Sequence, residues 1–147
     1  MSHYTVLVIP QDDLDSALAP FDENDEACEN PKWDWWTLGG RWSGTLKLKD
    51  YSERAVMSGF VPADASLEVD GAPAGVVDWE ATAKDRTDYA GTFALLTPEG
   101  EWLQRGEMGW WATVDPDKAT PDYNARWWEI VRGLPPEQMV YIVDCHI

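Results

Sequence analysis

The chain has 147 residues, of which 44% are hydrophobic, and its 27 acidic and 11 basic residues give a formal net charge of -16. This length and apolar content suit one domain with its own core and exclude a compositionally disordered chain. No apolar run approaches the ~20 residues that a membrane helix needs. Because a negative field repels nucleic acids and anionic membranes, we expect neither as a direct ligand.

The N-terminal part of the chain predicts two strands, a short helix and two unusual loops. Residues 3–9 (HYTVLVI) are β-branched and aromatic and precede a proline, which is typical of a strand. Residues 12–18 predict a short helix with aspartate at its start, and residues 21–31 an acidic loop. Residues 33–42 (WDWWTLGGRW) contain a glycine pair that interrupts regular structure and allows close backbone approach. Residues 43–49 alternate as a half-buried strand does.

The middle of the chain predicts a loop, a helix and a hairpin. Residues 50–74 lack periodicity and are expected to be loop-rich, and residues 76–86 predict a helix. Residues 92–97 and 102–105 flank a Pro-Glu-Gly-Glu turn, which predicts a β-hairpin. Residues 107–114 are expected to continue this meander.

The C-terminal part predicts one helix and one strand. Thr120 before a proline is typical of a helix start, and Trp127, Val131 and Leu134 then form one apolar stripe. Residues 139–147 (MVYIVDCHI) predict a strand that is apolar on both faces and therefore central in its sheet.

Strands outnumber helices in this order, and hairpin connections dominate. We therefore predict a single α+β domain over residues 1–147, a mostly antiparallel sheet with two or three helices packed on one face. Residues 1–31 contain no lysine or arginine, so they do not resemble a signal peptide. Cys28 and Cys145 form no CxxC pair, so we expect reduced thiols in a soluble, cytoplasmic protein.

The common catalytic and cofactor motifs are absent, so the sequence predicts no catalytic residue, no cofactor and no metal site by motif. Both histidines lie on the terminal strands. If these strands pair antiparallel, His3 lies near His146, and Asp144 shares the face of His146 while Cys145 does not. These histidines and Asp144 then form metal ligands, an acid–base pair, or merely an ordinary sheet end.

The tryptophans cluster with glycine and arginine at two places in the chain. Arg41 follows the glycine pair, and the segment that begins at Arg105 repeats the same residue types. Arginine among indole rings can stack and offer a bidentate fork to a carboxylate or phosphate, so the two segments together predict an aromatic pocket. The alternative is a structural arginine. The candidate ligand-binding residues are Trp35, Trp36, Arg41, Trp42, Arg105, Glu107 and Trp110.

Eight acidic side chains precede Lys32, the first basic residue of the chain. Such a segment favours a basic partner protein, including one whose usual ligand is nucleic acid. An acidic surface that serves solubility alone is the alternative. The candidate partner-binding residues are Asp12, Asp13, Asp15, Asp22, Glu23, Asp25, Glu26 and Glu29.

The blocks HYTVLVI, LAPFDEN, NPKWDWWTLGGRWSG, RGEMGWW and VDCHI resemble a family of small, acidic, tryptophan-rich proteins of bacteriophages and prophages that has no assigned activity. The resemblance runs along the whole chain. It implies an accessory protein that acts on a host protein, for example an inhibitor of a bacterial defence system such as an anti-CRISPR. The alternative is a nucleotide-binding or enzymatic protein with a Trp- and Arg-lined pocket; the sequence leaves catalysis open but favours a binding protein.

Overall fold

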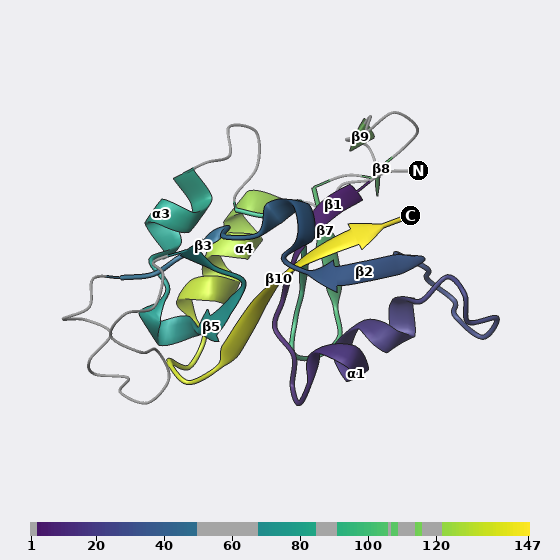
Figure 1. The fold of residues 1–147 in the computed structure, drawn as a ribbon, viewed down its shortest axis with the longest axis horizontal. Helices are drawn as coiled ribbons and strands as arrows, with labels where there is room; N and C mark the ends of the chain where they lie inside the picture. The colour runs from purple at the N-terminus through teal and green to yellow at the C-terminus, as the bar shows by residue number, and fades with distance from the viewer. Residues whose placement is uncertain (1–2, 50–67, 85–90, 106, 109–113, 116–121) are drawn as a thin grey trace.

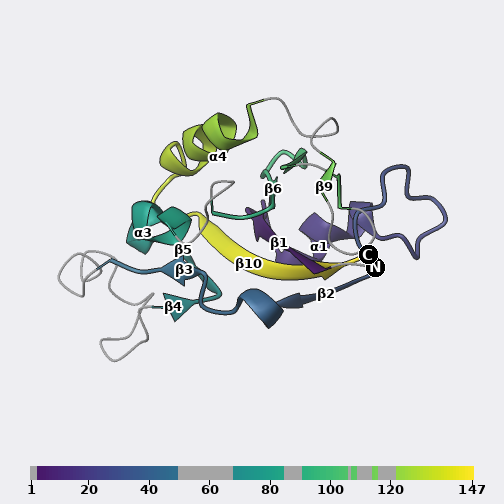
Figure 2. The ribbon, with the colours of Figure 1, turned by 90° about the horizontal axis from the view of Figure 1, so that it is seen from above.

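The computed structural model describes residues 3–49, 68–84, 91–105, 107–108, 114–115 and 122–147. A six-stranded sheet forms its centre (Figures 1 and 2). The strands of this sheet are β1 (His3–Val8), β2 (Trp35–Leu38), β5 (Gly71–Pro73), β6 (Ala94–Leu96), β7 (Trp102–Gln104) and β10 (Met139–His146). Two further pairs are β3 (Leu46–Lys47) with β4 (Glu68–Val69), and β8 (Glu107–Met108) with β9 (Val114–Asp115).

Short helices connect the strands, and none of those described is long and apolar enough to cross a membrane. Asp13 begins the first helix, because its Oδ1 accepts the N–H of Ser16 at 2.7 Å. The last helix follows Asp122, so the predicted cap at Thr120 is wrong. The α-helices are α1 (Leu14–Leu18), α3 (Trp79–Lys84) and α4 (Tyr123–Arg132), and the 3-10 turns are η1 (Ala19–Phe21), η2 (Gly40–Trp42) and η4 (Ala74–Val76).

Strand β10 is central, as its sequence predicts. One edge pairs antiparallel with β1, and the other pairs antiparallel with β2 and β5 in succession. The outer part of the sheet continues from β1 to β6 and β7. Because β1 and β6 run parallel, the sheet is mixed, although its other pairings are antiparallel as expected. The α+β class is confirmed.

The sheet is covered on both faces, and the prediction of helices on one face is wrong. Val6 and Val8 of β1 pack with Leu18 of α1. Leu7 between them packs on the opposite face, with Trp127 of α4. In Figure 1, α4 lies to the left of β1, and α1 lies below and to its right. The reason is that the chain is apolar at every position from Val6 of β1 to Ile9 just after it, so both faces of this strand need cover.

The sequence predicts most of the strands but not β2, β4 and β5, and β2 lies in the segment 33–42 that is predicted as a loop. The hairpin of β6 and β7 is confirmed, as is the burial of Leu46 and Leu48 on one side of the predicted strand at residues 43–49. The expected loop over residues 50–74 contains β4 and β5 at its end, and its start lies outside the described residues. The segment after β7 does not extend the meander, because β8 pairs with β9.

Helix α4 is held to the sheet by its aromatic side chains. Trp127 is fully buried, and its indole N–H donates to Thr92 Oγ1 at 3.1 Å. The hydroxyl of Tyr123 donates to the carbonyl of Thr92 at 2.6 Å. Gly91, whose φ is +52°, leaves room for this indole, because a Cβ built there would lie 2.2 Å from the Trp127 ring.

We predict that Gly91→Ala destabilises the protein far more than Gly100→Ala. Both residues have a positive φ, so each alanine costs roughly 1–2 kcal/mol of backbone strain. Only the alanine at 91 meets a neighbouring side chain, which adds about 1–3 kcal/mol of overpacking. Urea unfolding of the two variants measures the difference, and equal losses would contradict the packing of Trp127 against Gly91.

Candidate functional site

Both histidines meet at one end of the sheet. His3 of β1 lies directly opposite His146 of β10, as the predicted antiparallel pairing requires. Their ring centres are 4.8 Å apart, and the ring planes are inclined by 65°. Trp35 of β2 also pairs with His146, and its indole lies edge-on to the ring of His3 at 6.1 Å. The three rings thus come from three adjacent strands.

Asp144 holds the first histidine. It is only 2% exposed, and its Oδ1 lies 2.8 Å from Nδ1 of His3. Its Oδ2 accepts the backbone N–H of Arg41 at 3.0 Å. A buried carboxylate needs such donors, because desolvation strongly penalises an uncompensated charge. Asp144 therefore joins β10, β1 and the turn that contains Arg41.

Asp34 holds the second histidine in the same way. Its Oδ1 lies 2.7 Å from Nδ1 of His146, and its backbone N–H donates to the carbonyl of His146 at 2.8 Å. Both histidine side chains are about one-fifth exposed. The end of the sheet therefore carries two neighbouring carboxylate–imidazole pairs.

The glycine pair permits the turn beside these carboxylates. Gly39 and Gly40 both have a positive φ, which side chains disfavour. A Cβ at Gly40 would lie 2.4 Å from Oδ2 of Asp144, and a Cβ at Gly39 would lie 2.4 Å from Oδ2 of Asp70. Asp70 also accepts the N–H of Gly44 at 2.7 Å. The backbone at the glycine pair therefore approaches two carboxylates closely, which is the close approach that the sequence predicts.

The predicted aromatic pocket is divided by the fold. Trp36 packs on the α1 side of the sheet, whereas Trp42 packs on the α4 side. Trp35 is 51% exposed, and Arg41 is exposed in η2. Arg105 follows β7 and is half-buried. The Glu107 side chain and Trp110 lie outside the described structure, so their part in a pocket stays a prediction.

The part of the acidic segment that follows Phe21 forms a closed loop on the α1 side of the sheet. The backbone N–H of Glu23 donates to the carbonyl of Trp33 at 2.8 Å, and that of Lys32 donates to the carbonyl of Phe21 at 2.9 Å. Phe21 and Trp33 are buried at the base of the loop, and the hydroxyl of Tyr4 donates to the carbonyl of Lys32. The chain between these anchors projects carboxylates into solvent.

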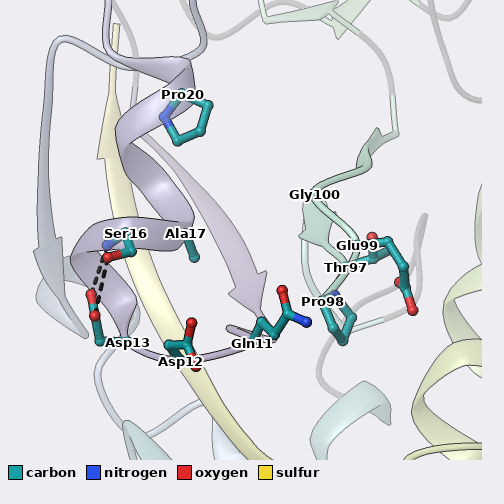
Figure 3. A pocket seen from close by; sticks show the side chains of 10 residues that line it. All are labelled: Gln11, Asp12, Asp13, Ser16, Ala17, Pro20, Thr97, Pro98, Glu99 and Gly100. Atoms are coloured by element: carbon teal, nitrogen blue, oxygen red, sulfur yellow. Dashed lines mark hydrogen bonds between the residues drawn. The ribbon is translucent and has the colours of Figure 1, made fainter.

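An open hollow of about 220 Å³ lies beside this segment, between α1 and the β6–β7 turn (Figure 3). Three of the lining residues are acidic: Asp12, Asp13 and Glu99. Asp13 accepts a hydrogen bond from the backbone N–H of Ser16 at the start of α1. This bond is the largest cause of the lowered pKa of the Asp13 carboxyl. The hollow therefore offers two further carboxylates to a cation.

Comparison with family models, with curated proteins and with solved structures finds no match to this chain. The resemblance to phage proteins consequently stays a prediction.

We predict that the neutral forms of His3 and His146 both carry their proton on Nδ1. An ionised carboxylate only accepts hydrogen bonds, so the ring nitrogen beside it must be the donor. Long-range proton–nitrogen NMR at alkaline pH distinguishes the tautomers by the nitrogen shifts. A dominant Nε2–H form at either ring would contradict the corresponding carboxylate contact.

The two cysteines are predicted to differ in reactivity. Cys145 is fully buried on the face opposite Asp144, and burial raises the pKa of its thiol, with a further contribution from the Asp144 charge. Cys28 is half-buried in the acidic loop. Because the thiolate is the reacting form, a thiol reagent should modify one cysteine in the folded protein and two in denaturant. Rapid native modification of Cys145, identified by peptide mapping, would contradict this.

Proposed function

We propose that this protein binds a basic host protein through the exposed acidic segment between Asp12 and Glu29 and modulates its activity. The observation that carries this proposal is that nearly all of these carboxylates face solvent and have no basic partner among the described residues. Seven of the eight acidic residues are exposed and Asp22 is half-buried. None of the eight forms an ion pair with a basic side chain in the part of the chain that the structure describes.

Local hydrogen bonds give the segment a defined backbone. Asp22 accepts the N–H of Asn24 at 2.8 Å, and Asp25 accepts the N–H of Ala27 at 2.9 Å. These turns, together with the closed base of the loop, fix the backbone before a partner arrives. Preorganisation of this kind reduces the entropy that binding must overcome.

The hollow of Figure 3 supports a basic rather than an apolar anchor in the partner. Asp12 and Glu99 face it from opposite sides, from the α1 side and from the β6–β7 turn. A lysine or arginine side chain would meet carboxylates in this hollow, and the surrounding negative field would accelerate its approach.

A partner that normally binds nucleic acid fits this surface, because carboxylates can occupy the places of phosphates. The phage resemblance suggests the biological setting: a host cytoplasm, with a nuclease or another component of a bacterial defence system as the target. The mode of action would then be inhibition, since the protein and the nucleic acid would compete for one basic site.

We expect the immobilised protein to capture a basic, nucleic-acid-binding protein from bacterial lysate, with capture lost at high salt and competed by short duplex DNA. In E23Q/E26Q the affinity for the captured protein should fall by roughly fivefold to tenfold, because two exposed charge contacts are worth about 1 kcal/mol together.

The matched control is E80Q/E129Q, which removes the same charge from the exposed surface of α3 and α4. It gives up the surface pair between Glu80 and Arg132 and the attraction between the exposed Glu129 and Arg126, which contribute little to stability. This control should bind as the parent protein does. Equal weakening by both variants would show that net charge alone attracts the partner, and capture that survives high salt would contradict an electrostatic interface.

A further inference from the structure

We infer that His3 and His146 form a binding site for a transition-metal dication such as Zn²⁺, with the Nε2 atom of each ring as a ligand. The inference rests on the carboxylate–imidazole pairs and does not depend on the proposed docking function. Sequence motifs predict no metal here, because the two residues stand at opposite ends of the chain and the register of β1 with β10 joins them.

The separation of the rings suits one shared ion. Zinc binds imidazole nitrogen at 2.0–2.1 Å, so two imidazoles on one tetrahedral zinc ion have ring centres about 5 Å apart. The observed separation is 4.8 Å. Facing positions on neighbouring antiparallel strands therefore provide the spacing before any ion arrives.

The carboxylates prepare both rings as ligands. Asp144 and Asp34 each accept from an Nδ1 atom, at 2.8 and 2.7 Å. This leaves the Nε2 lone pair of each neutral ring available, which is the tautomer that metal-bound histidine commonly shows. Neither Nε2 atom has a hydrogen-bond partner within the described structure.

The surroundings favour a cation. Both rings are partly exposed, so an ion can reach them from solvent. Two carboxylates stand behind the rings, where they raise ligand basicity and offset the positive charge. The net charge of -16 adds a long-range attraction.

The ligand set defines the chemical class. Imidazole nitrogen suits zinc, copper and nickel, whereas magnesium and calcium prefer oxygen. No set of three His, Cys, Asp or Glu side chains able to hold a metal occurs among the described residues. The two histidines therefore provide two ligands, and water or a group from a binding partner completes the coordination. Such an open site binds at micromolar rather than nanomolar concentrations.

An acid–base function for the same histidines is less well supported. General acid–base catalysis needs a substrate held within hydrogen-bond reach of the ring. Two hollows in the described structure are lined by other residues, one around Asp13 and Gly100 and one around Pro10 and Tyr141. A metal ion needs no such cavity.

Isothermal titration of the full chain with Zn²⁺ at neutral pH tests the inference. We expect one saturable site of micromolar affinity, and we expect H3Q and H146Q each to weaken it at least tenfold. Circular dichroism confirms that each variant folds. As a second measurement that needs no variant, Zn²⁺ should shift the Nε2 resonances of both histidines in the parent protein.

Two control variants exclude other zinc ligands. E23Q/E26Q lowers the negative charge of the acidic segment, and C28S removes the half-buried thiol, while both histidines remain. Each control should bind Zn²⁺ as the parent does. Failure of Zn²⁺ to bind below millimolar concentration, or binding that H3Q and H146Q leave unchanged, would overturn the inference. Neither result would bear on capture of a basic partner, because that assay depends on the carboxylates.

Discussion

Strand β10 is hydrogen-bonded along both of its edges, and the arrangement of the molecule depends on this constraint. Tyr141 to His146 pair with β1, while β2 and β5 share the other edge. Because the sheet is also covered on both faces, most of β10 is apolar and buried. The exception is its end, where Asp144 and His146 follow the apolar run. This C-terminal end of β10 lies away from α4 (Figure 1).

The buried carboxylate of Asp144 explains the neighbouring turn. A carboxylate with so little solvent contact must be compensated by hydrogen-bond donors, and it receives them from His3 and from the backbone N–H of Arg41. The backbone can come this close only because Gly40 has no side chain. The GGRW segment therefore serves backbone contact with Asp144 first, while the guanidinium of Arg41 stays at the surface.

The acidic loop and the histidine pair are linked although they serve different proposals. The side-chain amide of Asn24, within the loop, donates to the carbonyl of Asp34 at 2.9 Å. Asp34 in turn contacts Nδ1 of His146. Two successive hydrogen bonds therefore connect the acidic loop to His146. A partner bound to the loop would lie at the same end of the protein as the two histidines.

The sequence by itself determined the α+β class, the central last strand and the hairpin of β6 and β7, because periodicity and apolar runs are local signals. It placed His3 near His146 only on the condition that the terminal strands pair antiparallel, and the register of β1 with β10 meets that condition. It also located the exposed acids before Lys32. Only the tertiary structure decided that β1 needs helices on both faces, that Trp36 and Trp42 separate, and that Asp34 supports His146. Asp34 lies beside β2, a short strand without alternation that exists because the edge of β10 accepts it. Contacts of that kind depend on long-range pairing, which leaves no pattern in the residues on either side.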